Sequence, residues 1–328
     1  MALLEVKNLS VEFETRRGPL KALDQVSFEL NAGETLSLVG ESGCGKSITS
    51  LAIMGLLADN GRVTSGDIVY SGNSLLKLSE AELRKLRGRD LAMIFQDPMT
   101  SLNPAFTVGQ QLTETIFAHE GGTQSALQAR ARELLVQVGI PAPDERLNAY
   151  PHQLSGGMSQ RVMIAMAIAC RPKVLIADEP TTALDVTIQA QILELLRKLQ
   201  REQNMGLILI THDLGIVAET ADRVMVMYAG QVVEGGGTRE IIENPTHPYT
   251  RALLDSLPGA HAGIEKAHRS KLPSISGMVP DLARRPSGCQ FHPRCAYADD
   301  QCKTFGPALT GDTRRVRCFK PLLVRGAK

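Results

Sequence analysis

Short apolar runs bounded by chain-breaking residues recur along the first part of the sequence. Three of them cover Thr35 to Val39, Val174 to Ala177 and Leu207 to Ile210. A short run without polar alternation is typical of a strand that is buried on both faces, as in a parallel sheet. We therefore expect an α/β domain whose core is a largely parallel sheet.

Helical patterns lie between these expected strands. Ser79 and Glu82 have the spacing of a capping box, in which the two side chains satisfy backbone amides at a helix start. Residues 125–138 form a second pattern that Gly139 and Pro141 end. Its apolar face consists of Leu127, Ala131, Leu134, Leu135 and Val138. We expect this second helix to belong to a helical insertion.

The composition changes near residue 245. From Pro245 onward the chain carries 9 of its 17 prolines and 4 of its 6 cysteines, with little helical or strand periodicity. We therefore expect a main domain over residues 1–245 and a Cys-rich C-terminal extension over residues 246–328.

Charge and hydropathy argue against several classes of protein. The chain has 36 Lys and Arg residues against 35 Asp and Glu residues, so it lacks the basic balance typical of nucleic-acid binding. Its longest apolar run, Val162 to Cys170, is much shorter than the roughly 20 residues that a membrane span needs. The first residues show no signal-peptide pattern. We expect a cytoplasmic protein that binds no nucleic acid.

A phosphate-binding pattern follows the first apolar run. It matches G-x-x-x-x-G-K-[ST] and consists of Gly40, Glu41, Ser42, Gly43, Cys44, Gly45, Lys46 and Ser47. The glycines let backbone amides converge on phosphate oxygens, and a helix expected over Ile48 to Leu57 directs its positive end at them. Lys46 would reach the β- and γ-phosphates, and Ser47 would bind Mg²⁺. We interpret Cys44, at a variable position, as a passive thiol. A Gly-rich turn without a ligand is the alternative, although every fixed residue is present.

An acidic pair, Asp178 and Glu179, ends the second apolar run. Phosphoryl transfer to water needs one group that holds Mg²⁺ and another that orients the attacking water. We assign the first role to Asp178 and the second to Glu179. An Asp-Glu pair alone is usually a solvated strand end, but together with the phosphate loop it predicts a P-loop ATPase or GTPase.

A Ser- and Gly-rich segment lies about 20 residues before the acidic pair. Its sequence is Leu154, Ser155, Gly156, Gly157, Met158, Ser159 and Gln160. Alone it would be a helix cap, but in this position it resembles the signature motif of the ABC ATPases. The resemblance implies that Leu154, Ser155, Gly156, Gly157 and Gln160 act on ATP bound to the opposite subunit. It also implies the ABC cassette fold: a mostly parallel core sheet, an antiparallel β part and a helical subdomain at about residues 97–165.

Further motifs of this family occur in the expected order. The resemblance implies that Phe13 stacks on adenine, with core packing as the alternative. It implies that Gln96 contacts Mg²⁺ and the attacking water, and that His212 lies near the γ-phosphate. Glu179, His212 and Gln96 are therefore the expected catalytic residues. The loop that crosses the dimer interface corresponds to Ala183, Leu184 and Asp185.

The resemblance extends to the peptide and nickel importer group of ABC transporters. It rests on residues 93–109 (MIFQDPMTSLNPAFTVG), residues 150–193, the segment His247 to Thr250 and the cysteine-bearing tail. Within the group, the chain resembles ATPase subunits of dipeptide permeases. This implies ATP hydrolysis that energises uptake of dipeptides or short peptides. Nickel chelates and antimicrobial peptides are alternative cargoes, because the ATPase does not touch the cargo.

The same resemblance implies partners. In this group a paralogous ATPase subunit completes a heterodimer below two integral-membrane permease subunits, and a periplasmic binding protein delivers the substrate. We therefore expect peripheral attachment to the cytoplasmic face of the inner membrane, with residues 97–106 passing motion to a permease. A non-transport ABC ATPase is one rival, but its long coiled-coil or zinc insertions are missing from the sequence. A regulatory module that senses redox or metal is another.

Four cysteines of the C-terminal extension form a second candidate site. Cys289, Cys295, Cys302 and Cys318 have the spacing C-x5-C-x6-C-x15-C. A reducing compartment disfavours disulfides, and four thiolates suit either Zn²⁺ or a [4Fe-4S] cluster. The resemblance to dipeptide-permease subunits favours a structural cluster in a segment without an evident core. Four unligated thiols are the alternative, and His292 is a less favoured ligand.

Overall fold

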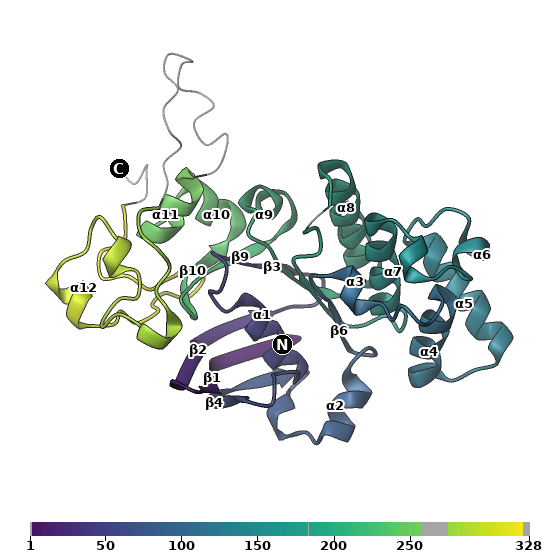
Figure 1. Ribbon diagram of the computed structural model, residues 1–328. Coiled ribbons are helices and arrows are strands. Elements are labelled where there is room, and N and C mark those ends of the chain that lie inside the picture. Colours follow the sequence, from purple (N-terminus) through teal and green to yellow (C-terminus); the bar gives the residue numbers. More distant parts are fainter. Residues whose placement is uncertain (1, 183, 257–274, 324–328) are drawn as a thin grey trace, which may run out of the picture.

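The computed structural model describes residues 2–182, 184–256 and 275–323 (Figure 1). Within these ranges, seven strands form the central sheet in the order β11-β10-β9-β3-β8-β7-β6. The pairs from β9 to β6 are parallel, whereas β10 and β11 pair antiparallel at the opposite edge. Its strands are β3 (Thr35–Val39), β6 (Leu91–Ile94), β7 (Val174–Asp178), β8 (Gly206–Ile210), β9 (Arg223–Tyr228), β10 (Gln231–Gly237) and β11 (Arg315–Val316). The three apolar runs therefore form buried parallel strands, as predicted.

A second sheet is wholly antiparallel and has the order β2-β1-β4-β5. Its strands are β1 (Leu4–Thr15), β2 (Gly18–Leu30), β4 (Gly61–Tyr70) and β5 (Asn73–Ser74). Apolar residues of this sheet, such as Leu9 and Leu23, share one buried cluster with Leu36 and Leu38 of the central sheet. This shared core fixes the antiparallel sheet against the strand that leads into the phosphate loop.

The structure describes the α-helices α1 (Lys46–Met54), α2 (Glu80–Leu86), α3 (Pro98–Ser101), α4 (Val108–Glu120), α5 (Gln124–Gln137), α6 (Pro143–Arg146), α7 (Gly156–Ile168), α8 (Val186–Gln203), α9 (Leu214–Thr220), α10 (Thr238–Glu243), α11 (Pro248–Asp255) and α12 (Asp300–Thr304). Several of them begin at a side-chain cap, as α2, α4, α5, α7 and α8 do. The capping box of Ser79 and Glu82 is present at the start of α2, as predicted. The first helix was predicted to reach Leu57 but ends at Met54, because Gly55 takes a left-handed conformation (φ 62°) and caps the helix with its backbone amide.

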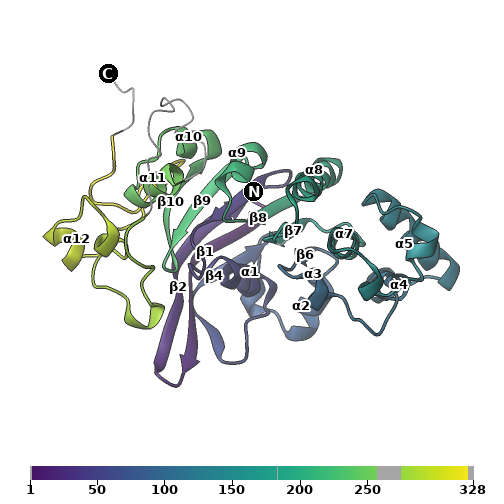
Figure 2. The same cartoon turned by 45° about the horizontal axis from the view of Figure 1, so that its top comes forward.

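Helices α4, α5 and α6 extend from one end of the molecule, and the C-terminal segment with α12 lies at the other end in both views (Figures 1 and 2). The predicted apolar face of α5 is buried against this group of helices and α7. Its members Leu127, Ala131, Leu134 and Leu135 are all buried. The helical insertion predicted around this segment is therefore present.

The C-terminal segment has a core, contrary to the expectation from its sequence. Phe291 packs against Tyr228 and Tyr249, with ring centroids 5.2 and 5.3 Å away, and all three rings are buried. β11 also extends the central sheet by pairing with β10. Irregularly spaced apolar residues make no periodic pattern, so this core was invisible in the sequence. Among the helices of the described part of the chain, none is long and apolar enough to cross a membrane.

Candidate nucleotide-binding site

Four neighbouring strands of the central sheet deliver the predicted catalytic groups to one edge. β3 leads into the phosphate loop, β8 precedes His212, β7 ends at Asp178, and β6 precedes Gln96. These strands are adjacent in the order β3-β8-β7-β6. Since the carboxyl ends of parallel strands meet at one edge, residues far apart in sequence come together where ligands bind in open α/β sheets.

The phosphate loop is held in shape by two glycines and a lysine. A Cβ atom at Gly40 (φ 150°) would collide with the Met227 carbonyl oxygen, and one at Gly45 (φ 105°) would come within 2.6 Å of Leu23. Lys46 is buried at the start of α1, where its Nζ donates to the carbonyl oxygens of Gly40 at 2.7 Å and of Glu41 at 3.2 Å. The loop therefore curls around the lysine that was predicted to reach phosphate.

The other loop residues divide into exposed and buried groups. Ser42, Gly43 and Ser47 are exposed, whereas Cys44 is fully buried. Burial raises the pKa of the Cys44 thiol, which keeps it protonated. This supports the interpretation of Cys44 as a passive thiol.

Asp178 has the environment expected of a magnesium ligand. Its carboxylate is buried at the end of β7, and Oδ1 has no hydrogen-bond partner among the described residues. Burial raises the pKa of Asp178, although a hydrogen bond from Ser47 lowers it. An unsatisfied buried carboxylate oxygen beside a hydroxyl fits a hard cation such as Mg²⁺, which prefers oxygen ligands.

Glu179 is the centre of a small polar cluster. Gln96 Nε2 donates to Glu179 Oε2 at 3.1 Å, Thr182 Oγ1 donates to the same oxygen at 2.9 Å, and His212 Nδ1 lies 3.5 Å from Oε1. The backbone of Glu179 has a φ of 47°, unusual for a residue other than glycine, and its amide donates to Ile210. All three predicted catalytic residues therefore meet at one carboxylate. Thr182 was not predicted, although it lies only three residues after Glu179.

The predicted adenine partner lies in the antiparallel sheet. Phe13 lies on β1 and is partly buried, with its ring packed so closely on Gly61 that a Cβ atom there would come within 2.5 Å of it. Phe13 also packs against the core cluster that includes Leu23. Stacking on adenine stays a prediction, because the position is compatible with either role.

The signature residues lie on a separate helix start. Ser155 caps α7 by accepting from the Met158 amide at 3.3 Å, and Gly156 and Gly157 form its first turn. Leu154 is partly buried, and Gln160 is buried with its Nε2 unpaired among the described residues. In the part of the chain that the structure describes, no hydrogen bond or ion pair joins these residues to the chain's own phosphate loop.

The predicted dimer-interface loop is only partly described. Ala183 lies outside the described residues, and Leu184 packs against the core. Asp185 caps α8 by accepting from the Ile188 amide at 3.0 Å. Both residues have contacts within this chain, and their place at a dimer interface stays a prediction.

The four predicted thiols of the C-terminal segment surround one small cavity. Its lining includes Phe291, His292, Cys289, Cys295, Cys302 and Cys318. Burial raises the pKa values of Cys289 and Cys295, and it raises the pKa of Cys318 to about 11. Within the described ranges, however, no three His, Cys, Asp or Glu side chains are arranged to hold a metal ion. Zinc and the iron–sulfur cluster therefore both stay predictions.

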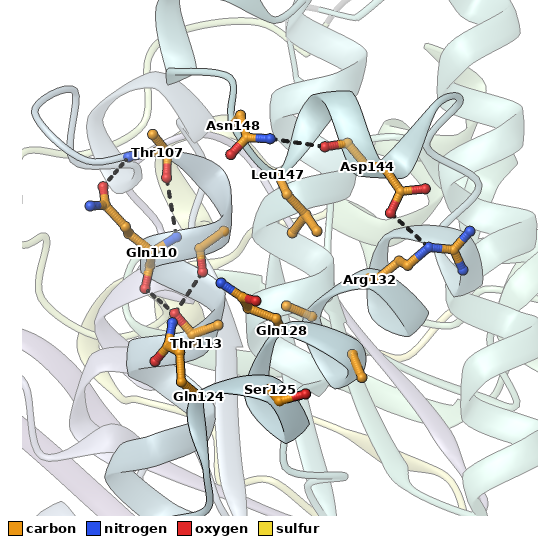
Figure 3. Close-up of a pocket in the computed structure, with 13 residues that line it drawn as sticks. Thr107, Gln110, Thr113, Gln124, Ser125, Gln128, Arg132, Asp144, Leu147 and Asn148 are labelled. Atoms are coloured by element: carbon orange, nitrogen blue, oxygen red, sulfur yellow. Dashed lines mark hydrogen bonds and ion pairs between the residues drawn. The ribbon is translucent and has the colours of Figure 1, made fainter.

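A polar cavity of about 720 Å³ lies in the helical insertion (Figure 3). Arg132 Nε pairs with Asp144 Oδ1 at 2.8 Å on its wall, and Asn148 donates to the Asp144 carbonyl oxygen. None of the residues that line this cavity belongs to the predicted nucleotide or cysteine sites. The cavity is therefore separate from the phosphate loop.

Fold and site together define a P-loop ATPase of mixed α/β architecture. A family model described as ABC transporter matches residues 23–182, and one described as the C-terminal region of oligopeptide/dipeptide transporters matches residues 233–302. The dipeptide transport ATP-binding protein DppD of Haemophilus influenzae is 57% identical over 327 residues, which cover 99% of this chain and 98% of the relative. The chain therefore belongs to the ABC transporter family, and the predicted resemblance to its peptide-transport ATPases is confirmed.

Other comparisons agree. The oligopeptide transport ATP-binding protein OppD of Bacillus subtilis is 54% identical over 297 residues, which cover 90% of this chain and 82% of the relative. A solved dimeric ATP-binding cassette in a post-hydrolysis state, bound to ADP and Pi, is 29% identical with a TM-score of 0.65 and covers 72% of this chain and 99% of that structure. The cassette fold predicted from the sequence is thus confirmed.

Proposed function

We propose that this chain is the ATP-hydrolysing subunit of an importer for dipeptides or short peptides. The observation that carries the proposal is the convergence of Gln96 and His212 on Glu179, beside a complete phosphate loop. The family of the chain and its similarity to dipeptide transport proteins support the same activity. Nickel chelates and antimicrobial peptides are the alternative cargoes.

The residues of the site have distinct roles in this proposal. Lys46 and the loop amides bind the β- and γ-phosphates, and Ser47, Asp178 and Gln96 supply oxygen ligands to Mg²⁺. When bound, Mg²⁺ neutralises phosphate charge. Glu179 orients the attacking water and accepts its proton. Thr182, Gln96 and His212 hold the Glu179 side chain near the position of that water.

The second half of each ATP site comes from a partner. We propose a heterodimer with a paralogous ATPase subunit, in which Leu154, Ser155, Gly156, Gly157 and Gln160 act in trans and Ala183, Leu184 and Asp185 cross the interface. The exposed start of α7, with no bond to the chain's own phosphate loop among the described residues, supports action on another chain. ATP then favours the closed dimer because both subunits contact it.

The dimer works below two integral-membrane permease subunits in this proposal, and a periplasmic binding protein delivers the cargo. The chain is peripheral, at the cytoplasmic face of the inner membrane. Residues 97–106, which begin the predicted helical subdomain at about 97–165, pass the motion of Gln96 to a permease. The domain division into residues 1–245 and 246–328 is part of the same proposal.

Transport by the reconstituted assembly tests the function. Proteoliposomes that contain this chain, its paralogous ATPase, both permeases and the binding protein should take up a labelled dipeptide when ATP is supplied. A non-hydrolysable ATP analogue should stop the uptake. Uptake of a nickel chelate without peptide uptake would instead assign the alternative cargo. A chain that fails to associate with permease-containing vesicles would indicate a non-transport ATPase.

We also propose that the four-thiol cavity holds a [4Fe-4S] cluster that orders the C-terminal segment. The convergence of Cys289, Cys295, Cys302 and Cys318 on one cavity supports this, because four thiolates are a normal ligand set for such a cluster. Among the described residues no three His, Cys, Asp or Glu side chains are arranged around one metal ion, so the proposal is based on the four thiols that line the same cavity.

Metal analysis under anaerobic conditions tests the cluster. The protein should contain iron and acid-labile sulfide and absorb near about 400 nm. Cys318→Ser should lose this absorption. Cys170→Ser should keep it, because Cys170 is buried in the cluster that contains the apolar face of α5. Stoichiometric zinc would replace the cluster assignment. A protected sample without metal would show that the thiols are unligated.

A further inference from the structure

The C-terminal segment reaches the phosphate loop directly. Arg294 Nη1 lies 2.7 Å from Glu41 Oε2, and Arg294 Nη2 lies 3.0 Å from Oε1. Glu41 is the second residue of the phosphate loop and is separated from Arg294 by 253 positions. This is a two-pronged guanidinium–carboxylate pair, the ion-pair geometry with the greatest directional specificity.

The pair is shielded from solvent on the arginine side. Only 4% of the Arg294 side chain is exposed, against 27% of the Glu41 side chain. Arg294 also donates to the Tyr228 hydroxyl at 3.3 Å and to the Ser276 carbonyl oxygen at 3.0 Å. Its guanidinium lies 5.8 Å from the centre of the Tyr228 ring. Contacts with Tyr228 and Ser276 therefore orient the Arg294 side chain independently of its pair with Glu41.

Glu41 is held through its backbone as well as its side chain. Its amide donates to the Tyr249 hydroxyl at 3.0 Å, and its carbonyl oxygen accepts from Lys46 Nζ at 3.2 Å. Tyr249 belongs to α11 and is fully buried. Residues after position 245 thus bind the same loop residue that contacts the phosphate-binding lysine.

From these contacts we infer that Arg294 is a positioning residue for nucleotide binding, acting through Glu41. Two physical effects follow from the pair. It neutralises a carboxylate that would otherwise repel the triphosphate, and its two prongs fix the first turn of the loop so that less ordering remains when ATP binds. The inference rests on the proposed ATPase function, because it concerns the affinity of the same site.

Substitution of Arg294 tests this role in the full-length protein. Arg294→Gln should weaken binding of a fluorescent ATP analogue by roughly tenfold, equivalent to about 1.4 kcal/mol. Arg294→Lys keeps the charge without the two-pronged geometry. Its affinity for the ATP analogue should therefore lie between those of the parent and of Arg294→Gln. In the assembled transporter, Arg294→Gln should raise KM for ATP and leave kcat nearly unchanged, because Gln96, Glu179 and His212 are untouched.

A second substitution separates the charge effect from general damage. Adding Glu41→Gln to Arg294→Gln removes the unpaired carboxylate and should recover part of the lost affinity, which is the signature of a direct coupling. The matched control is Arg314→Gln, which breaks the pair between the C-terminal segment and Glu234 at 3.1 Å, away from the loop. The control should lower the melting temperature without changing ATP affinity.

Two outcomes would overturn the role of Arg294. Arg294→Gln and Arg294→Lys proteins that both bind ATP within twofold of the parent would overturn the inference. An equal loss of affinity in Arg314→Gln would also overturn it, since the effect would then come from general loosening of the segment. If the parent protein itself bound no ATP, the proposed function would fail instead.

Discussion

At the scale of single residues, the site depends on contacts between side chains that are distant in sequence. Glu179 accepts a hydrogen bond from Gln96, 83 positions before it, and lies beside His212, which follows β8. Taken alone, a Gln, a Glu or a His at each of these positions would not indicate a functional site. Their meeting at one carboxylate is the geometry from which we propose a hydrolytic centre at this edge of the sheet.

Lys46→Ala should abolish most of the ATP affinity while the fold survives. The substitution removes a charge-assisted donor to the phosphates, and the carbonyl oxygens of Gly40 and Glu41 lose the hydrogen bonds that Lys46 donates to them. We expect at least about a tenfold loss in the titration of a fluorescent ATP analogue. Lys198→Ala, at an exposed position on α8, is the control. Parent-like affinity in Lys46→Ala would mean that the phosphates bind elsewhere.

His247 should make the protein less stable in mild acid. Burial lowers the pKa of His247 to about 4 from an ordinary value of 6.5, although Glu234 nearby raises it. Between these values the unfolded chain binds more protons, so the free energy of unfolding decreases as pH falls below about 6.5 and the loss is complete near pH 4. Its upper limit is on the order of 3 kcal/mol.

The matched variant for this pH effect is His247→Asn. Asparagine can replace the ring nitrogen that accepts from the Tyr249 amide at the start of α11, but it does not titrate. Urea unfolding across pH 4 to 6.5 should therefore show a shallower pH dependence in the variant. Identical slopes in the two proteins would exclude His247 as the source.

At the scale of elements, local sequence signals predicted most of the local structure, with the end of α1 as an exception. The capping box at Ser79 and the apolar face of α5 were predicted from residue spacing, and the three buried strands were predicted from short apolar runs. The end of α1 was predicted too late because apolar residues continue to Leu57. The helix ends at Met54 because Gly55 takes a left-handed backbone conformation. The φ angle of a glycine within an apolar run cannot be predicted from the sequence.

Ser155→Arg should prevent formation of the closed dimer without damaging the chain's own ATP pocket. Ser155 is an exposed helix cap, so an arginine there adds bulk at the start of α7. Thr123→Arg is the matched control, because Thr123 caps α5 with the same bond to the third helical residue and loses a similar stabilisation of about 1 kcal/mol. ATP-dependent dimerisation, followed by light scattering, should disappear only in Ser155→Arg. Loss of ATP binding in that isolated subunit would count against action in trans.

At the scale of the whole molecule, the C-terminal segment and the phosphate loop form one connected unit. The sequence predicted a C-terminal extension without an evident core, and it contained no sign of the aromatic core around Phe291 or of the pair between Arg294 and Glu41. The pair joins residues 253 positions apart, the aromatic rings are also distant in sequence, and one unaligned sequence contains no periodic signal for such contacts. The motifs for phosphate, acid pair and signature were visible because their chemistry requires fixed local spacing.

The most direct test of the account is ATP turnover by Glu179→Gln in the assembled transporter. Glutamine keeps the size of the side chain and its bond to Thr182 but no longer accepts a proton from water. We predict ATP affinity within about threefold of the parent and hydrolysis slowed by at least about a hundredfold, a barrier increase near 2.7 kcal/mol. Turnover at the parent rate, with ATP bound normally, would contradict the assignment of Glu179 as the residue that activates water.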